Sequence, residues 1–485
     1  MTVRAEDKFQ FLSDRDRPPV IVDAKYHKTG VVRFDGNPFI EALPPLDPDR
    51  NALLAKLENN PPKPTRATRN SPEIVRLMEL STIGDVVYPF TDYAKAALAI
   101  TTMIRESYVA RNPVTTVDMQ RRHAIAAGDD GVPFPANWKS SAKGYGIFGI
   151  TGMGKTTFLD AILLHYPEAI HHKHYHGKSL VALQVVYIVL RIPHDATLKS
   201  LCIGFVVEID RITGSKNAEK ARTIRNIAPM VELMRTVATA VSLSLMAIDE
   251  LQNLGAARGA NAEYTLNLFG TIIERLGISL LVLATPAIGM VLLQDVRNAR
   301  KTVTTGSVSL TPMIRNSAEW CDFCHVHWQY TYTKKHARLT KDTLKAWFEV
   351  SAGDTGFAVA AFQIAQRNAI GGVEHVDADG FRRVMGTDMA ILQPAVSALL
   401  SGDPDRLNKF EDLTFRDPKV QALLDSIGEF PLGADTDTGV EEFDDLASEA
   451  SPTPAKRRPG GPRTATRRNP SDLFPVENPL ASPTN

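Results

Sequence analysis

One stretch constrains the fold of this chain more than any other, the run Gly149-Ile150-Thr151-Gly152-Met153-Gly154-Lys155-Thr156. An apolar segment, residues 145–148, precedes it, and apolar residues at helical spacing follow from Thr157. A strand, a glycine-rich loop and a helix in this order give the pattern G-x-x-x-x-G-K-[ST] its meaning as a phosphate-binding loop. Backbone N–H groups then surround the phosphates, Lys155 reaches the β- and γ-phosphates, and the Thr156 hydroxyl ligates Mg²⁺. The residues expected to contact the nucleotide are Gly149, Thr151, Gly152, Met153, Gly154, Lys155, Thr156 and Thr157.

The composition limits what else the chain can be. Its 485 residues are enough for two or three folded units, and 44% hydrophobic with 23% charged residues is typical of globular proteins. The net charge of zero excludes a globally basic nucleic-acid binder, so any DNA contact must be a local patch. Three cysteines, a charged N-terminus without an apolar signal and no apolar run of about 18 residues predict a cytoplasmic protein that does not span a membrane.

Strands and helices alternate in the middle of the chain. Continuous apolar runs at residues 145–150, 183–192, 243–248 and 278–284 predict strands that are covered on both faces. Alternation of this kind predicts an α/β domain with a largely parallel sheet. Helical spacing over residues 72–109 predicts two helices that are separated near Tyr88-Pro89.

Two adjacent carboxylates follow the third of these runs. Leu245-Met246-Ala247-Ile248 leads directly into Asp249 and Glu250. Ligands of open α/β sheets bind at the carboxyl ends of the strands. We therefore expect Asp249 to hold Mg²⁺ through water and Glu250 to act as the general base on the attacking water. Acidic pairs also begin helices, but a complete phosphate loop upstream favours the catalytic interpretation.

Three further residues are candidates for the same site. The fourth run ends at Thr285, whose hydroxyl is the candidate contact for the γ-phosphate or the attacking water; a threonine that only ends a buried strand is the alternative. Arg297 and Arg300 lie in a basic cluster beyond it. A guanidinium supplied across a subunit boundary stabilises charge on the γ-phosphate, so either could be an arginine finger, with a solvated basic face as the alternative.

Other patterns in the chain receive no chemical role. Cys321-Asp322-Phe323-Cys324-His325 matches the C-x-x-C-H string, but the chain lacks a second cysteine pair, and nearby aromatic residues indicate a packed element. The histidines between residues 165 and 176 are expected in a solvated loop. Arg105 and Arg111 flank a predicted helix and are expected to be solvated.

The chain divides into four predicted regions. Residues 1–70 form a proline-rich N-terminal arm that either binds a partner or packs on its own domain, and residues 71–335 form the α/β core with its leading helices. Residues 336–432 form a helical lid with C-terminal helices. Residues 433–485 form an acidic and then basic tail that is expected to be disordered until it binds.

A phosphate loop, Asp-Glu after a strand, a threonine at a strand end, an arginine pair and a helical lid, in this order, resemble the AAA+ ATPases. Within them, Asp249-Glu250-Leu251-Gln252-Asn253-Leu254 resembles the signature of the TnsC/TniB regulators of transposition. Similarity extends over roughly residues 35–370. Many AAA+ proteins carry a lid arginine in a Gly-x-x-Arg pattern, whereas this lid reads Gly353-Asp354-Thr355-Gly356.

The resemblance implies an ATP- and Mg²⁺-dependent ATPase that forms a homo-oligomeric ring or helical filament around double-stranded DNA. It also implies that the protein links a TnsD/TniQ-type target selector to the transposase subunits, and that hydrolysis controls disassembly. Phosphate contacts repeated along a filament suit a neutral chain. Candidate DNA contacts are Lys199, Arg211, Lys216 and Lys220. An AAA+ helicase loader and a non-hydrolysing, nucleotide-bound adaptor remain as alternatives.

Overall fold

The computed structural model describes residues 18–128, 134–192, 197–253, 260–285, 288, 300–407 and 410, with the backbone alone for residues 260–263, 265, 404 and 405. Arg297, Leu254 and the predicted tail at 433–485 lie outside the described residues.

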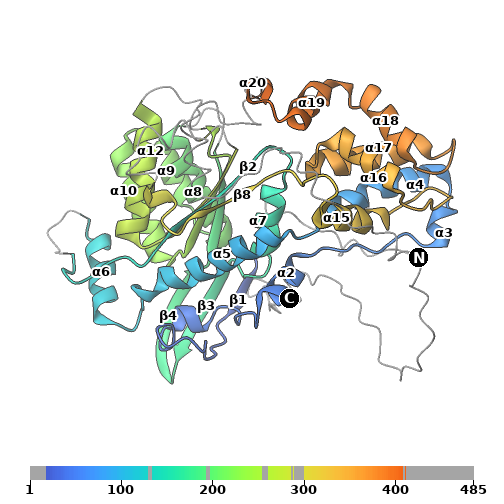
Figure 1. The fold of residues 1–485 in the computed structure, drawn as a ribbon. Helices are drawn as coiled ribbons and strands as arrows, with labels where there is room; N and C mark the ends of the chain where they lie inside the picture. The colour runs from blue at the N-terminus through green and yellow to red at the C-terminus, as the bar shows by residue number, and fades with distance from the viewer. Residues whose placement is uncertain are drawn as a thin grey trace, which may run out of the picture.

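The centre of the molecule is a parallel five-stranded sheet with the order β5-β6-β7-β2-β8 (Figure 1). All four of its ladders are parallel, as the alternating pattern predicts. Because β7 lies between β2 and β6, the loop after β2 and the carboxylates after β6 both border the end of β7. The strands are β2 (Gly144–Gly149), β5 (Tyr187–Arg191), β6 (Leu245–Asp249), β7 (Ser279–Ala284) and β8 (Ser307–Leu310).

Helices cover both faces of this sheet, which explains the continuous apolar runs. Along β6, Leu245 and Ala247 pack on one side with α5 and α7, whereas Met246 and Ile248 pack on the other side with α8, α10 and α12. Successive side chains of a strand point to opposite faces, so a strand buried on both faces must be apolar at every position. Figure 1 shows these two helical layers around the sheet. Their bounds are α5 (Thr91–Val109), α7 (Lys155–Leu163), α8 (Leu198–Thr213), α10 (Ile227–Ala240) and α12 (Ala260–Thr271).

The predicted strand at residues 183–192 is two strands in two sheets. β4 (Lys178–Val185) pairs with β3 (Ala169–Tyr175), and β5 begins two residues later in the central sheet. The segment with His171, His172 and His174 is therefore strand β3 rather than a loop, although His171, His174 and His176 are exposed as expected. His172 is buried and hydrogen-bonds the Tyr26 hydroxyl and the Gln184 side chain, each at 2.9 Å.

The N-terminal arm, described from residue 18, packs on its own domain. β1 (Ile21–Asp23) pairs in parallel with β3, and buried apolar residues of α1 (Pro38–Glu41) and α2 (Arg50–Leu57) join the core on the α5 side. Arg105 holds this junction by donating to the Pro44 carbonyl, and Arg111 lies within the core, so both correct the expectation that they are solvated. Arg105 and Arg111 are each 2% exposed, and their guanidinium groups donate to carbonyls, including that of Leu243 at 2.7 Å for Arg111.

A second helical body packs around aromatic rings (Figure 1). Trp347 lies at its centre, with ring centroids 5.1 Å from Phe381 and 4.8 Å from Phe362. We call this body the lid. Its helices are α15 (Ala318–Trp328), α16 (Lys341–Ser351), α17 (Thr355–Ala369), α18 (Ala378–Gly386) and α19 (Gln393–Ser401).

The lid also includes residues from early in the chain. Arg76 of α4 (Glu73–Glu79) is buried and pairs with Glu374 at 2.6 Å, and the Gln363 side chain donates to the Leu80 carbonyl at 3.1 Å. A 3₁₀ segment, Leu80–Asp85, follows α4, and α5 begins only at Thr91. The helices are thus separated around Tyr88-Pro89, as predicted. The other described helical segments are α3 (Arg66–Arg69), α6 (Thr116–Ala126), α9 (Asn217–Thr223), Ile272–Leu276, Ala390–Leu392 and α20 (Pro404–Leu407).

Within the described ranges, no single helix is long and apolar enough to cross a membrane. One pair of helices, Ala378–Gly386 with Ala390–Ser401, passes that test jointly by length and composition, but it is bent by 75°.

Candidate functional site

The phosphate loop connects β2 to α7 with two glycines in the left-handed region. Gly152 has φ +97° and Gly154, which precedes α7, has φ +73°. Residues with a Cβ rarely adopt such values, so the loop requires glycine at both positions. The Lys155 ammonium donates to the carbonyls of Gly149 (2.7 Å) and Ile150 (2.9 Å) and therefore lies against the phosphate loop itself.

The predicted magnesium ligands lie together at the carboxyl edge of the sheet. The Thr156 hydroxyl donates to Asp249 Oδ2 at 2.9 Å, although the two residues belong to different elements. Asp249 is 2% exposed, and its Oδ1 accepts the N–H of Glu250 at 3.0 Å. A hydroxyl and a carboxylate are the oxygen ligands that Mg²⁺ takes in nucleotide sites, so these two side chains fit the ion.

The Gln252 side chain forms hydrogen bonds with both Glu250 and Thr285. The Gln252 amide donates to the Glu250 carboxylate, and its Oε1 accepts the Thr285 N–H at 3.1 Å. Glu250 is exposed and has φ +61°, a value that is uncommon outside glycine and costs free energy. The Thr285 hydroxyl is buried without a hydrogen-bond partner among the described residues. The general base and the sensor threonine predicted from the sequence are thus brought together.

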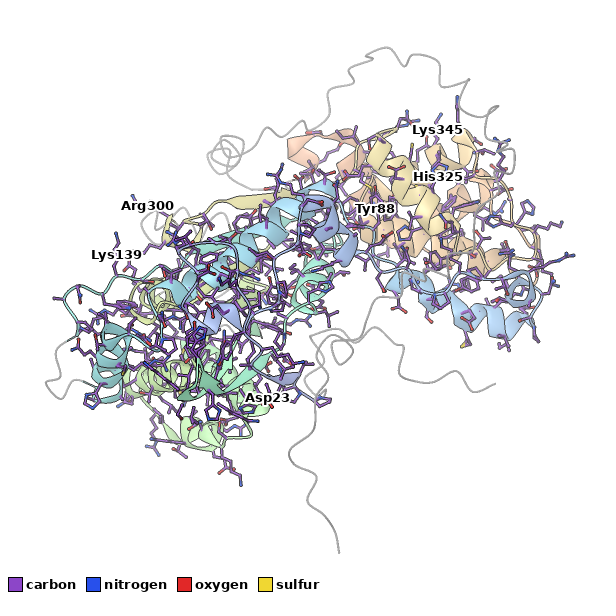
Figure 2. All side chains as sticks on the ribbon, turned by 90° about the horizontal axis from the view of Figure 1, so that it is seen from below. Asp23, Tyr88, Lys139, Arg300, His325 and Lys345 are labelled. Carbon is purple, nitrogen blue, oxygen red and sulfur yellow. The ribbon has the colours of Figure 1, made fainter. Side chains whose placement is uncertain are left out.

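Arg300 lies at the amino-terminal end of the strands, whereas the phosphate loop lies at their carboxyl end. It precedes β8, and the next two residues, Lys301 and Thr302, pass against Gly144 at the start of β2. The loop follows Gly149 at the other end of that strand, roughly 17 Å away at 3.3 Å per residue. Arg300 is exposed, and Figure 2 shows it near Lys139 and remote from lid residue Lys345. The structure therefore does not bring Arg300 to the phosphate loop of its own chain.

A small cavity of about 130 Å³ borders the phosphate loop at Met153. Phe90, Met313 and Leu310 supply apolar walls, and Glu319 supplies a carboxyl group whose pKa is raised, mainly by burial. Ligand pockets combine apolar walls with a few polar groups in this way.

The four predicted DNA contacts lie in different environments. Lys216 and Lys220 are exposed at α9, and Lys199 is half-buried at the start of α8. Arg211 is bound by the carboxylates of Glu168 and Glu208 within the domain, so its charge is already neutralised. The structure therefore does not support a DNA contact by Arg211.

The Cys321–Cys324–His325 string lies on α15. Cys324 is buried among aromatic rings, as the packed-element interpretation requires, and His325 is bonded to the Cys321 carbonyl. In the described part of the chain, no group of three or more His, Cys, Asp or Glu side chains could hold a metal ion.

Sequence reasoning missed several residues of the site. Gln252 is part of the sequence signature and had no predicted role, yet its side chain hydrogen-bonds both Glu250 and Thr285. Arg191 ends β5 with its Nε 3.7 Å from Asp249 Oδ2, and a charged residue directly after an apolar strand could have signalled it. Asp354 and Thr355 contact the loop from the lid, a contact that no local pattern predicts.

One family model and several solved structures are similar to parts of this chain. No curated protein matches the chain in sequence. It resembles the solved Walker-type ATPase PABY2304 of Pyrococcus abyssi (13% identity, 54% of this chain and 71% of that chain covered, TM-score 0.36). It also resembles the RuvB Holliday junction branch migration motor of Thermotoga maritima (12% identity, 58% and 80% covered, TM-score 0.30). Residues 139–290 match the family model of an AAA domain.

The matched residues span the phosphate loop, β6 with Asp249 and β7 with Thr285. These elements border one edge of the parallel sheet, where the hydroxyl of Thr156 meets the carboxylate. The chain therefore contains an AAA domain with the fold of a P-loop ATPase.

Proposed function

We propose that this protein is an ATP-dependent regulator of DNA transposition. It assembles on double-stranded DNA, links a target-selection protein to the transposase, and uses ATP hydrolysis to control disassembly. The observation that carries the proposal is the Gln252 bridge between Glu250 and Thr285, because it gives the glutamine of the TnsC/TniB-like signature a place in a hydrolytic site.

The proposed reaction is attack of water on the γ-phosphate of ATP. Mg²⁺ held by Thr156 and Asp249 would neutralise charge on the β- and γ-phosphates. The exposed Glu250 carboxylate accepts a proton from the attacking water, and Gln252 holds that carboxylate toward Thr285. The Thr285 hydroxyl, buried and without a protein partner among the described residues, is available to bind the γ-phosphate or the water.

The opposite positions of Arg300 and the phosphate loop support assembly in a head-to-tail arrangement. An arginine that cannot reach its own loop acts only when a second copy presents a nucleotide to it. Repeated head-to-tail contacts close into rings or continue as helical filaments. Arg297 shares this proposed role.

A basic cleft provides a surface for the DNA backbone on this neutral chain. The cleft has a volume of about 720 Å³ and is lined by Arg33, Arg50, Lys95 and Lys143, of which Lys95 pairs with Asp92 at 3.0 Å. Its one lining carboxylate, Glu106, pairs with Arg33 at 3.0 Å. The lining tyrosine, Tyr145, is buried and cannot stack on bases, which favours a duplex over a single strand. Contacts to phosphates alone would be independent of sequence.

The proposal is tested by sedimentation and negative-stain imaging of the protein on duplex DNA with and without ATP. ATP-dependent assembly is expected, and Lys155→Ala should abolish it because the lysine binds the phosphates. Equal binding with and without ATP would refute the proposal. A preference for single-stranded over double-stranded DNA in the same assay would instead favour a helicase loader, and phosphate release distinguishes an ATPase from a nucleotide-bound adaptor.

A further inference from the structure

The phosphate loop contacts the lid at Gly152. The carbonyl of Gly152 accepts two hydrogen bonds, one from the Thr355 hydroxyl at 2.7 Å and one from the Gly356 N–H at 3.0 Å. Both donors belong to the first turn of α17. The main lid helix therefore begins directly on the loop that would hold the phosphates.

The contact leaves no free space on either side of the turn at residues 353–356. A methyl group added to Gly152 would lie 2.4 Å from Asp354 Oδ1, and one added to Gly356 would lie 3.0 Å from the Gly152 Cα. On the far side, Met313 donates its N–H to the Gly353 carbonyl at 3.0 Å. Because the turn is held between the loop and the segment after β8, a shift of the loop must move the lid.

The two hydrogen bonds also set the direction of a phosphate-binding group. A trans peptide is planar, so fixing the Gly152 carbonyl toward the lid points the N–H of Met153 the opposite way. That N–H has a long contact of 3.4 Å with the Ile150 carbonyl. Loop N–H groups of this kind bind phosphate oxygens, so the lid affects how well the loop is prepared for them.

Asp354 adds a charge beside the same loop. It is fully buried, and its Oδ1 accepts the Phe357 N–H at 2.9 Å as the N-cap of α17. Its Oδ2 is buried without a hydrogen-bond partner among the described residues. Burial raises the pKa of this carboxyl to about 7. A carboxylate in this position opposes the binding of negative phosphates, because charges interact strongly where water is excluded.

We propose that Thr355 and Gly356 position the phosphate loop through the Gly152 carbonyl, and that Asp354 makes the lid responsive to the charge of the bound phosphates. The inference rests on the proposed ATP site. In this lid, the contact that responds to the bound nucleotide consists of two hydrogen bonds and a carboxylate. It lies at the Gly-x-x-Gly turn, where many AAA+ proteins carry an arginine.

Calorimetric titration with a non-hydrolysable ATP analogue and Mg²⁺ tests the proposal. Thr355→Val keeps the side-chain shape but removes the hydroxyl, and it should weaken binding about fivefold. Thr355→Ser should restore it. Asp354→Asn keeps a capping acceptor and removes the charge, so it should tighten binding about tenfold. Asp377→Asn is the matched control, because Asp377 caps α18 of the same lid by accepting the Gly380 N–H.

Hydrogen exchange at the Gly356 amide separates a positioning role from a structural one. The analogue should change the exchange of this amide in the wild type and not in Thr355→Val. Wild-type affinity in both Thr355→Val and Asp354→Asn, with exchange at residues 355–357 unresponsive to the analogue, would overturn the inference while leaving the ATP site intact. Folded wild-type protein that does not bind the analogue would contradict the ATP site itself.

Discussion

At the scale of single residues, the site depends on side chains whose partners are distant in sequence. Asp249 and Glu250 are adjacent, yet Asp249 is buried against Thr156 while Glu250 is exposed. The positive φ of Glu250 turns its side chain away from the strand direction, which separates the proposed metal ligand, Asp249, from the proposed general base. Two neighbouring carboxylates can thus perform different tasks.

Replacing Glu250 by glutamine should stop hydrolysis and keep binding. The amide cannot accept the water proton, so we expect phosphate release to fall by about 10² to 10⁴-fold. The ATP-bound, DNA-bound assembly should then persist in sedimentation. A variant that hydrolyses ATP at the wild-type rate would show that another group is the base.

Gln252→Ala should lower turnover about tenfold with little change in nucleotide affinity, because Gln252 touches Glu250 and the Thr285 backbone rather than the phosphate loop. Steady-state kinetics and a binding titration measure the two quantities. Gln363→Ala, which removes a hydrogen bond to the Leu80 carbonyl in the lid, is the matched control. Loss of affinity in Gln252→Ala would assign the residue to binding.

At the scale of helices and strands, the sequence predicted the elements whose environment is uniform. β2, β6 and β7 are buried on both faces, so their apolar runs are unambiguous. The apolar run at 183–192 predicted one strand but forms parts of two, because only Val186 separates β4 and β5, which belong to different sheets. The prediction that Arg105 and Arg111 are solvated failed for another reason. Charge predicts exposure, and the carbonyls that bind these guanidinium groups come together only in the folded chain.

The join between the lid and the N-terminal segment should depend on the pair of Arg76 and Glu374. Hydrogen bonds from Arg76 lower the pKa of Glu374 to about 2, with burial opposing. A depressed carboxyl pKa stabilises the fold above the unfolded pKa, and the contribution is lost as the pH falls from about 5 toward 2. Glu374→Gln should therefore cost about 1–2 kcal/mol at pH 7, and less at pH 3.

Urea unfolding at the two pH values measures this difference. Glu349→Gln is the control, because Glu349 and Arg315 form an exposed pair at 4.0 Å. Exposed pairs contribute about 0–1 kcal/mol, so this variant should unfold like the wild type. Equal stability of Glu374→Gln and wild type at pH 7 would contradict the prediction.

At the scale of the whole molecule, the proposed function depends on contacts between copies. If Arg300 acts on a neighbour, Glu250→Gln and Arg300→Ala should each be inactive alone and partly active when mixed. In the mixture, some interfaces combine the intact Glu250 of one variant with the intact arginine of the other. Phosphate release measures recovery. No recovery, with both variants still assembling, would remove Arg300 from the role and leave Arg297 as the candidate.

The basic cleft predicts how DNA affinity depends on salt. Each lost phosphate contact lowers the slope of log K against log salt by about one. Arg50→Ala with Lys143→Ala should therefore reduce the slope by about two. Lys335→Ala with Lys345→Ala should leave it unchanged, because Lys335 hydrogen-bonds Glu374 in the lid and Lys345 lies on α16 (Figure 2). If Lys216→Ala with Lys220→Ala produces the loss instead, the DNA lies along α9.

The aromatic packing of the lid makes it an optical reporter. Of the four tryptophans, Trp320, Trp328 and Trp347 lie in the lid, and Trp138 lies in the sheet body beside Arg121. Intrinsic fluorescence of the unlabelled protein is thus weighted toward one of its two bodies. With Trp138→Phe, tryptophan emission would come from the lid alone, and its response to nucleotide could be followed in real time with excitation selective for tryptophan.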